Sequence, residues 1–241
     1  MCGRFSQQRP ASELAEIFAA EPLADELGAR YNVAPTDEAL VVVQRQDRRA
    51  ITAYRWGLIP HWADAAKVGS RMFNARSETL TGSPAFRDLF RRKRCLVPVD
   101  AFYEWHREGT RRQPFTIGRA DGRPLALAGL WSGWRDPAAD RVLRTFTIIT
   151  SGPNDQMAGL HDRMPVIVPD DAWEMWLDPE LDDPSELQGL FEPTDDVELR
   201  IQAVSSLVNN VRNDGPALIE PLDEAAIAAL AADRAPAGLF D

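Results

Sequence analysis

A cysteine followed by a glycine stands second in the chain, in the run Met1-Cys2-Gly3. Loss of the initiator methionine, which a small second residue allows, would leave Cys2 with a thiol and a free α-amine on one carbon. An α-amine has a pKa of about 7.8, against about 10.4 for lysine, so it is the more nucleophilic amine at pH 7. Such a 1,2-aminothiol reacts with aldehydes: the amine forms an imine, and the sulfur closes a thiazolidine ring. A cysteine near a frayed terminus can equally be without function, so other residues must decide.

Two further segments place an amide or an imidazole two residues before an arginine. Asn74 and Arg76 stand in the polar run 73–79, and in an extended chain residues two apart point to the same side. The amide can orient a carbonyl or hydroxyl group while the guanidinium binds a phosphate. His161 precedes Arg163 in the same way, ahead of an apolar strand. Taken singly, Asn74 is also typical of a turn, and His161 of an ordinary loop histidine.

A carboxylate stands among aromatic residues in the run Phe102-Tyr103-Glu104-Trp105. Desolvation in such surroundings favours a role in proton transfer. The alternative is a surface residue that pairs with Arg107. Beside the aminothiol of Cys2, however, Glu104 belongs to a set of side chains able to move protons and to orient a carbonyl group.

Strands are the elements that must position these residues. Alternating apolar residues, with turns at Glu108-Gly109 and Asp121-Gly122, predict antiparallel pairing. The expected fold class is α+β, with a mainly antiparallel sheet or an open β-barrel-like core and flanking helices. The predicted strands are 40–44, 51–56, 95–99, 102–106, 114–117, 125–131, 144–150 and 165–168, after an extended loop over 30–36.

Helix caps and apolar spacing predict four helices. One domain is expected over residues 1–222, followed by a C-terminal helix and a loose tail in 223–241. The predicted helices are 12–18, capped by Ser12; 84–90, capped by Ser83 with Pro84 at its first position; 171–177, capped by Asp170 or Asp171; and 223–231.

The composition is that of a globular chain of 241 residues, 44% of them apolar, which is enough for one full core. No apolar run has membrane-spanning length and no signal peptide is visible, so we expect a soluble, cytoplasmic protein without membrane contact. Two cysteines, Cys2 and Cys95, are too few for a disulfide framework. The three histidines show no zinc-ligand spacing, and neither a metal nor another cofactor is expected.

The net charge of −10 is unevenly spread along the chain. Residues 1–168 have a balance of +5 and residues 169–241 one of −15, so a basic face toward DNA phosphates is compatible with the first two thirds. The run 91–94 would equally suit the end of a helix, whose dipole favours cations there. The acidic third is a solvated face by default. The densest basic stretch comprises Arg71, Arg76, Arg87, Arg91, Arg92, Lys93 and Arg94.

Seven short motifs follow one another along the chain. They are Met1-Cys2-Gly3-Arg4-Phe5, Tyr31-Asn32-Val33-Ala34-Pro35, Trp56-Gly57-Leu58-Ile59-Pro60, Asn74-Ala75-Arg76-Ser77-Glu78-Thr79, Phe102-Tyr103-Glu104-Trp105, His161-Asp162-Arg163-Met164-Pro165 and Val204-Ser205-Ser206-Leu207-Val208-Asn209. This ordered set resembles the SOS response-associated peptidase family, whose members crosslink to abasic sites in single-stranded DNA. The resemblance extends from residue 2 to about residue 222.

The resemblance implies a role for each candidate residue. In this family the processed N-terminal cysteine attacks the open-chain aldehyde of an abasic deoxyribose, and the resulting thiazolidine shields the lesion from strand cleavage. Cys2 would be the nucleophile, Asn74 would hydrogen-bond the sugar, and Glu104 would be the general acid and base. His161 would assist proton transfer to the sugar hydroxyl or the adjacent phosphate. The DNA would be bound by Arg4, Arg76 and Arg163 at flanking phosphates, and by Trp62 with Pro35 at the kinked strand.

The family name also implies a peptidase-like event, the removal of the residue before Cys2. Here that residue is Met1, which a general methionine aminopeptidase could also remove. Because an imine at the sugar favours β-elimination, a weak lyase activity is expected beside the crosslink. The expected partner is single-stranded DNA that contains abasic sites, bound covalently by a monomer that associates with the nucleoid and with replication-fork proteins.

Three alternatives remain open. A cysteine after the initiator methionine also opens the N-terminal-nucleophile glutamine amidotransferases, although no glutamine-binding motif is found here. A noncovalent single-strand binding module would need only the arginines with Trp56, Trp62 and Trp105, and it would bind intact and abasic strands equally. A protease that acts on other proteins would need an additional nucleophile, which the sequence does not offer.

Overall fold

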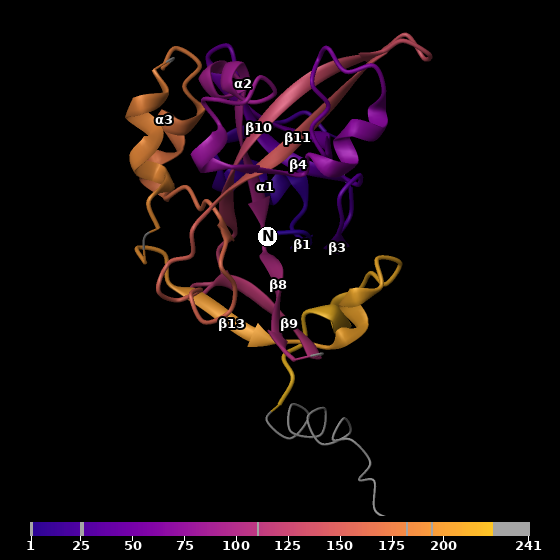
Figure 1. Cartoon of the computed structure of the whole chain (residues 1–241), viewed down its shortest axis with the longest axis vertical. Coiled ribbons are helices and arrows are strands. Elements are labelled where there is room, and N and C mark those ends of the chain that lie inside the picture. The colour runs from indigo at the N-terminus through magenta and orange to yellow at the C-terminus, as the bar shows by residue number, and fades with distance from the viewer. Residues whose placement is uncertain (1, 25–26, 110, 182, 194, 224–241) are drawn as a thin grey trace, which may run out of the picture.

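Strands make up most of the regular structure and form two sheets (Figure 1). The computed structural model describes residues 2–24, 27–109, 111–181, 183–193 and 195–223. Within these residues, one sheet has the strand order β12-β11-β10-β7-β4-β5-β2 with β6 beside β11, and the other has the order β13-β9-β8-β1-β3.

The elements have the following bounds. The strands are β1 (Phe5–Gln7), β2 (Ala20–Pro22), β3 (Arg30–Val33), β4 (Glu38–Arg45), β5 (Arg48–Trp56), β6 (Asn74–Arg76), β7 (Arg94–Val99), β8 (Ala101–Glu108), β9 (Arg111–Arg119), β10 (Leu125–Asp136), β11 (Arg141–Ser151), β12 (Met164–Pro165) and β13 (Leu199–Ala203). The α-helices are α1 (Ala11–Ile17), α2 (Arg87–Arg92) and α3 (Trp173–Leu177), and short 3₁₀ helices include η2 (Ser77–Thr79) and η5 (Ser206–Asn209).

The larger sheet closes on itself because β11 pairs with strands on both of its sides. It runs antiparallel to β10 and parallel to β5, where Phe146 faces Trp56. Antiparallel pairs of β10 with β7, β7 with β4 and β4 with β5 complete the ring, so these five strands enclose a barrel without a free edge between them. Buried side chains such as Val41, Trp56, Val97 and Phe146 form its apolar core.

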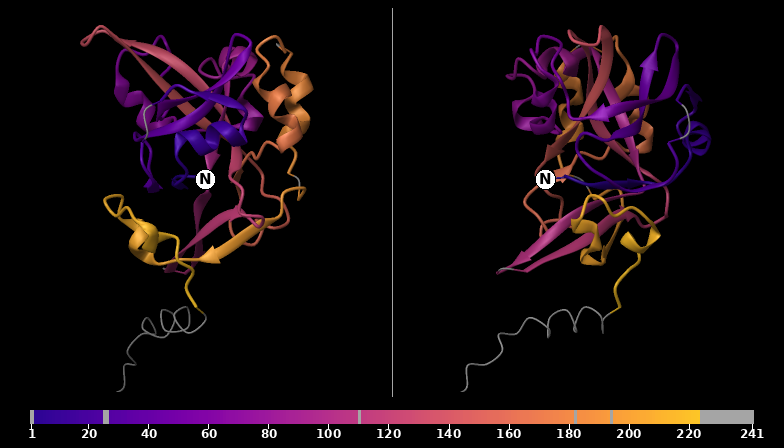
Figure 2. Two further views of the ribbon diagram at one scale, coloured as in Figure 1. Left: turned by 180° about the vertical axis from the view of Figure 1, so that it is seen from behind. Right: turned by 90° about the vertical axis from the view of Figure 1, so that its right-hand side faces the viewer.

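The second sheet lies at one end of this barrel (Figures 1 and 2). Strand β8 follows β7 after the single residue Asp100, and β1 pairs with β8 on one side and with β3 on the other. Phe5 of β1 and Phe102 of β8 lie opposite each other and are buried in the same cluster as the barrel core, together with Cys2. The start of the chain is therefore held at the junction of the two sheets.

The helices pack outside the barrel around another apolar cluster. Phe18, just after α1, stacks on Trp173 of α3 with ring centroids 4.3 Å apart. On another side, the β10–β11 hairpin extends away from the body of the molecule (Figure 2). The helices and the far end of the hairpin therefore lie outside the barrel.

Arg94 is buried at the start of β7 rather than exposed on a basic face. Its guanidinium donates to the carbonyl oxygens of Phe90 and Arg91 in α2, at 2.7 and 2.5 Å, and of Trp176 in α3, at 2.6 Å. Burial lowers the pKa of Arg94 to about 10. The inclusion of Arg94 in a DNA-facing basic stretch is therefore wrong, because its donors are used to join two helices to the barrel.

Each predicted strand is found, although several are longer than expected. The last is shorter: β12 covers Met164–Pro165, and Ile167 forms only an isolated bridge with Leu127. Positive φ angles at Gly109 and Gly122 confirm the two predicted turns. The sequence did not predict the short strands β1, β2, β6 and β13, nor that β3 lies within the segment expected to be a loop. Their partners are distant in the chain, so local alternation carries little information about them.

The predicted helix starts are wrong. Ser12 lies inside α1, whose N-cap is Pro10 without a side-chain hydrogen bond, and α2 begins at Arg87 rather than directly after Ser83. Neither aspartate caps α3, since both belong to a 3₁₀ turn over Asp170–Ala172 that precedes it. These short helices do not depend on side-chain caps. The ring of Pro10 fixes its φ angle at the start of α1, and tertiary packing stabilises all three helices.

Part of the C-terminal prediction lies outside the described residues, namely the helix over 223–231 and the tail after it. The domain boundary at residue 222 stays a prediction. In the described ranges, no helix has the length and apolar character needed to cross a membrane.

Candidate active site

Cys2 and Asn74 are joined by a hydrogen bond at the junction of the two sheets. The side-chain Nδ2 of Asn74 donates to the carbonyl oxygen of Cys2 at 2.7 Å. Asn74 is held in place because β6 runs parallel to β11, with Asn74 opposite Ile148. Its Oδ1 is buried and has no hydrogen-bond partner among the described residues. The amide thus orients the backbone of Cys2 and keeps an acceptor for another group.

The thiol of Cys2 is fully buried, and its Sγ lies 3.9 Å from the carbonyl oxygen of Arg4. Burial raises the pKa of the Cys2 thiol above its usual range, and the Glu104 carboxylate raises it further. The sulfur is therefore a neutral thiol at pH 7. Attack by this sulfur requires a neighbouring group that accepts its proton.

Glu104 and His161 face each other with the types of side chain that can exchange a proton. Glu104 projects from β8 and is only 2% exposed, and its Oε2 lies 3.9 Å from Nε2 of His161. Nδ1 of His161 accepts a hydrogen bond from the backbone N–H of Arg163 at 3.0 Å, which places the ring proton on Nε2, toward Glu104. The exposed Asp162 carboxylate lies 2.8 Å from Nδ1.

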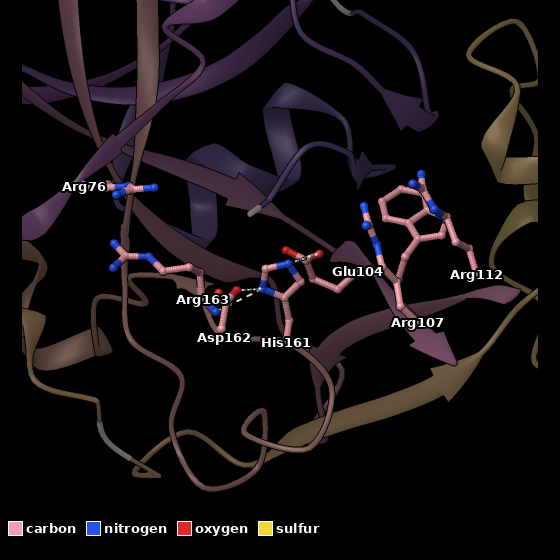
Figure 3. A pocket seen from close by; sticks show the side chains of 8 residues that line it. Arg76, Glu104, Arg107, Arg112, His161, Asp162 and Arg163 are labelled. Carbon is pink, nitrogen blue, oxygen red and sulfur yellow. Dashed lines mark hydrogen bonds and ion pairs between the residues drawn. The ribbon is translucent and has the colours of Figure 1, made fainter. Parts of the chain in front are cut away.

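A cleft of about 540 Å³ opens beside this acid–base pair. Figure 3 shows Arg76 and Arg163 on one side of Glu104 and His161, and Arg107 and Arg112 on the other. The lining residues are Arg76, Glu104, Trp105, Arg107, Arg112, His161, Asp162 and Arg163. In a chain of net charge −10, this cleft gathers four arginines against two acidic residues.

The two arginines predicted at the motif ends differ in their surroundings. The guanidinium of Arg163 forms a two-pronged ion pair with Glu78 of η2, with Nη2 3.0 Å from Oε2, and it also donates to the carbonyl oxygen of Thr150 at 2.5 Å. These hydrogen bonds lower the pKa of Glu78 to about 2. Arg76 is exposed and has no ion pair within the described part of the chain. Arg163 is thus held in place by Glu78 and Thr150, while the Arg76 side chain is exposed at the cleft.

Arg4 is engaged by the protein instead of lining the cleft. Its Nη1 donates to Oδ1 of Asn32 at 2.9 Å and to the carbonyl oxygen of Val208 at 2.8 Å, and burial lowers its pKa. Pro35 lies in the turn after β3, and Trp62 lies in a loop with 59% of its surface exposed. Neither is among the residues that line the cleft, and the DNA-binding role of all three stays a prediction.

The structure therefore gathers six of the nine predicted residues. Four of them line the cleft: Arg76, Glu104, His161 and Arg163. The other two, Cys2 and Asn74, are joined by a hydrogen bond, and Cys2 lies close enough to Glu104 for the carboxylate to raise the pKa of its thiol.

The sequence analysis missed Arg112 as a site residue and assigned Arg107 only to pairing with Glu104. The predicted turn at Glu108-Gly109 was the available signal, since a hairpin there brings Arg107 opposite Arg112.

A comparison with known families identifies the family of this chain. The sequence model of the family described as SOS response associated peptidase (SRAP) matches residues 1–211. This chain belongs to the SRAP family. The family predicted from the seven motifs is confirmed.

Curated SRAP relatives are named abasic site processing proteins. The YoqW protein of Bacillus subtilis is 40% identical over 223 residues, which cover 91% of this chain and 99% of that protein. The YedK protein of Escherichia coli is 30% identical, covering 92% of this chain and all of the relative. The HMCES protein of Pongo abelii is 31% identical, covering 92% of this chain and 77% of the relative.

Solved structures show the same SRAP fold. A protein from Bacteroides thetaiotaomicron superimposes with a TM-score of 0.82 at 24% identity, covering 92% of this chain and all of the other. A protein from Bordetella bronchiseptica has a TM-score of 0.70 at 28% identity, covering 85% of this chain and all of the other. The predicted α+β fold with a barrel-like core is confirmed.

Proposed function

We propose that this protein processes abasic sites in single-stranded DNA by forming a thiazolidine crosslink between Cys2 and the deoxyribose. The observation that carries the proposal is the Asn74 hydrogen bond to the Cys2 carbonyl oxygen, which holds an N-terminal cysteine beside Glu104 at an arginine-lined cleft. The names of the curated relatives support the same substrate.

The first step joins the α-amine of Cys2 to the sugar aldehyde, after removal of Met1. The amine lone pair forms the new carbon–nitrogen bond, the aldehyde oxygen takes up protons, and water leaves to give an imine. Glu104 is the proton carrier for this step, because its carboxyl group lies beside the buried start of the chain. The open-chain aldehyde is a minor form of the sugar. Reaction with it is therefore faster when the amine and the proton carrier are already held in position.

The second step closes the ring. Sγ of Cys2 adds to the imine carbon, and the thiol proton passes by way of Glu104 to the nitrogen that was the α-amine. Because burial keeps the sulfur protonated, this transfer must accompany the attack. Aldehyde and aminothiol together give one thiazolidine and one water, so the sequence needs no oxidant, reductant or cofactor.

The other site residues bind and orient the strand. His161, with its Nε2 proton toward Glu104, relays a proton to the sugar hydroxyl or the adjacent phosphate, and Asn74 hydrogen-bonds the sugar through its free Oδ1. Arg76 and Arg163 bind flanking phosphates. Exposed Trp62, with Pro35, stacks at a kinked single strand, and Arg4 anchors the backbone next to Cys2.

Two side activities follow from the same chemistry. The imine acidifies the neighbouring sugar proton, so β-elimination and strand cleavage compete with ring closure. Removal of Met1 is the only peptidase-like step that the mechanism needs. The proposed setting is a cytoplasmic monomer that meets replication-fork proteins and the nucleoid when bound to DNA.

The deciding experiment incubates the purified protein with single-stranded DNA that contains one abasic site. We expect a heat-stable adduct on a denaturing gel, with a mass equal to DNA plus protein without Met1 and minus one water. Intact DNA of the same sequence should give none. The Cys2→Ser variant should lose the stable adduct and retain strand cleavage through its amine, and an undiminished adduct with that variant would overturn the mechanism.

A further inference from the structure

Two arginines face each other on the wall of the cleft. Arg107 of β8 lies directly opposite Arg112 of β9 in the antiparallel register, and both side chains are exposed. Like charges directly opposite on neighbouring strands repel each other and destabilise the pair. Among the side chains that the structure describes, no ion pair joins either guanidinium to an acidic residue. Two like charges therefore stand opposite each other on the wall of the cleft.

A similar pair elsewhere in the molecule is compensated. Arg45 of β4 lies opposite Arg48 of β5, also beside a hairpin turn. There Nη1 of Arg48 is 3.1 Å from Oε2 of Glu21, and its Nε is 3.8 Å from Oδ1 of Asp47. Described acidic side chains thus accompany the pair that lies outside the cleft, while the pair on the cleft wall lines a cavity that is open to a ligand.

The position of the cleft pair indicates what that ligand is. Figure 3 shows Arg107 and Arg112 across the Glu104–His161 pair from Arg76 and Arg163. Trp105, between Glu104 and Arg107 in β8, also lines the cleft. Its indole is fixed because Nε1 donates to Oδ1 of Asn209 at 2.7 Å. A positive group therefore stands at each end of the cleft, with the acid–base pair between them.

We propose that Arg107 and Arg112 form a second phosphate subsite, which binds the DNA backbone on the side of the lesion opposite Arg76 and Arg163. The inference rests on the proposed function, in which the abasic sugar lies at Glu104. Guanidinium groups bind phosphate oxygens with paired hydrogen bonds, and a phosphate between two facing arginines also relieves their repulsion. The strand is then held on both sides of the sugar, so the site takes lesions inside a strand.

A binding measurement with intact single-stranded DNA tests the subsite without any covalent step. The Arg107→Ala/Arg112→Ala double variant should bind about ten-fold more weakly at low salt. Its plot of log affinity against log salt should lose about 0.7 from its slope, because the two arginines neutralise one phosphate of a single strand. The matched control is Arg45→Ala/Arg48→Ala, which should stay within two-fold of the parent protein. The cleft variant should melt at the same or a higher temperature, since it removes a repulsion.

Adduct formation then locates the subsite relative to the lesion. Three strands are compared: one with the abasic site in the interior, one without nucleotides on the 5′ side, and one without nucleotides on the 3′ side. The cleft double variant should react more slowly than the parent on the interior lesion and on one truncated strand. It should match the parent on the other truncated strand, which lacks the flank that the two arginines bind.

The outcomes separate this inference from the proposed function. Unchanged affinity and salt slope in the cleft variant would overturn the subsite, and so would an equal loss of rate on all three strands. If the parent protein formed no adduct but the salt slope still fell in the cleft variant, the proposed function would be wrong. Arg107 and Arg112 would then still be a phosphate-binding pair. A lower melting temperature in the cleft variant would show that the arginines stabilise the hairpin, contrary to the inference.

Discussion

At the scale of single residues, the neighbours of Cys2 control its backbone position and the ionisation of its thiol. Its sulfur is buried and protonated, and its carbonyl oxygen is fixed by Asn74. Glu104 is the ionisable residue that both raises the pKa of the Cys2 thiol and faces His161. Glu104 is therefore the residue whose replacement should most clearly separate thiol ionisation from catalysis.

The Glu104→Gln variant should have two opposite effects. Crosslinking to abasic DNA should slow by about 10²- to 10⁴-fold, the usual value of a positioned acid–base group. Alkylation of Cys2 by a small reagent should shift to lower pH, because removal of the carboxylate charge lowers the pKa of the thiol. The pH profile of alkylation, followed by mass spectrometry, measures the second effect.

Cys95 is the internal control for that experiment. Burial alone raises the pKa of its thiol, so its alkylation should be the same in both proteins. A Cys2 profile that does not move, or a crosslinking rate equal to that of the parent, would contradict the role given to Glu104.

At the scale of elements, short polar contacts hold the site between strands that are far apart in the chain. Arg163, just before β12, is bound to Glu78 of η2 and to Thr150 of β11. Arg94 of β7 does the same for the outer layer, where it joins α2 and α3. Each contact leads to a stability prediction.

Stability should depend on pH through Glu78. The pKa of Glu78 is about 2 in the folded protein, against an ordinary value of 4.5, so the unfolded chain binds more protons between these values. The ion pair therefore stabilises the fold above pH 4.5, and this stability is lost as the pH falls toward 2. Because the Glu78 side chain is 55% exposed, we expect a loss below about 1 kcal/mol.

Urea unfolding of the parent protein and Glu78→Gln across this pH range measures the effect. The free energies of unfolding should differ at pH 6 and converge near pH 2. A difference that persists unchanged to pH 2 would show that the ion pair is not its source.

Replacement of Arg94 should be far more damaging. The Arg94→Ala variant leaves several buried carbonyl oxygens without donors and opens a cavity, so we expect a loss of about 3 kcal/mol or more in the free energy of unfolding. The control is Arg91→Ala, because that side chain is exposed and its carbonyl oxygen remains. Thermal melting compares the two, and an equal loss in both would argue against the hydrogen bonds of Arg94 as the cause.

At the scale of the whole molecule, the site lies where the barrel meets the second sheet. Cys2 precedes β1, Asn74 lies in β6 beside the barrel, Glu104 lies in β8 of the second sheet, and His161 lies in the loop before β12. Acidic residues of the last third partly neutralise basic residues of the first two thirds: Asp170 pairs with Arg119, and Asp214 with Arg30. The acidic third is therefore integrated into the fold at these points.

Arg4 links the two ends of the described chain, since its partner Val208 is 204 residues away. The Arg4→Ala variant should lose about 1 to 3 kcal/mol of folding free energy through these hydrogen bonds, measured by urea unfolding. Its crosslinking should also slow, because Cys2 is two residues away. If Arg4 acts only through the protein, the salt slope of DNA binding should not change, whereas a smaller slope would identify a phosphate contact.

The sequence by itself determined the family and most strands, and it predicted four of the residues that line the cleft, together with Cys2 and Asn74. Motif order and two-residue alternation can be recognised directly along the sequence, without knowledge of the tertiary structure. Only the tertiary structure decided the parallel pairings of β11 with β5 and β6, which close the barrel and carry Asn74 to Cys2. The tertiary structure also decided which arginines are available to a ligand. Arg4 and Arg94 donate hydrogen bonds to the protein itself, while Arg107 and Arg112 line the cleft. The reason is physical, because burial and available acceptors depend on segments that are distant in the chain.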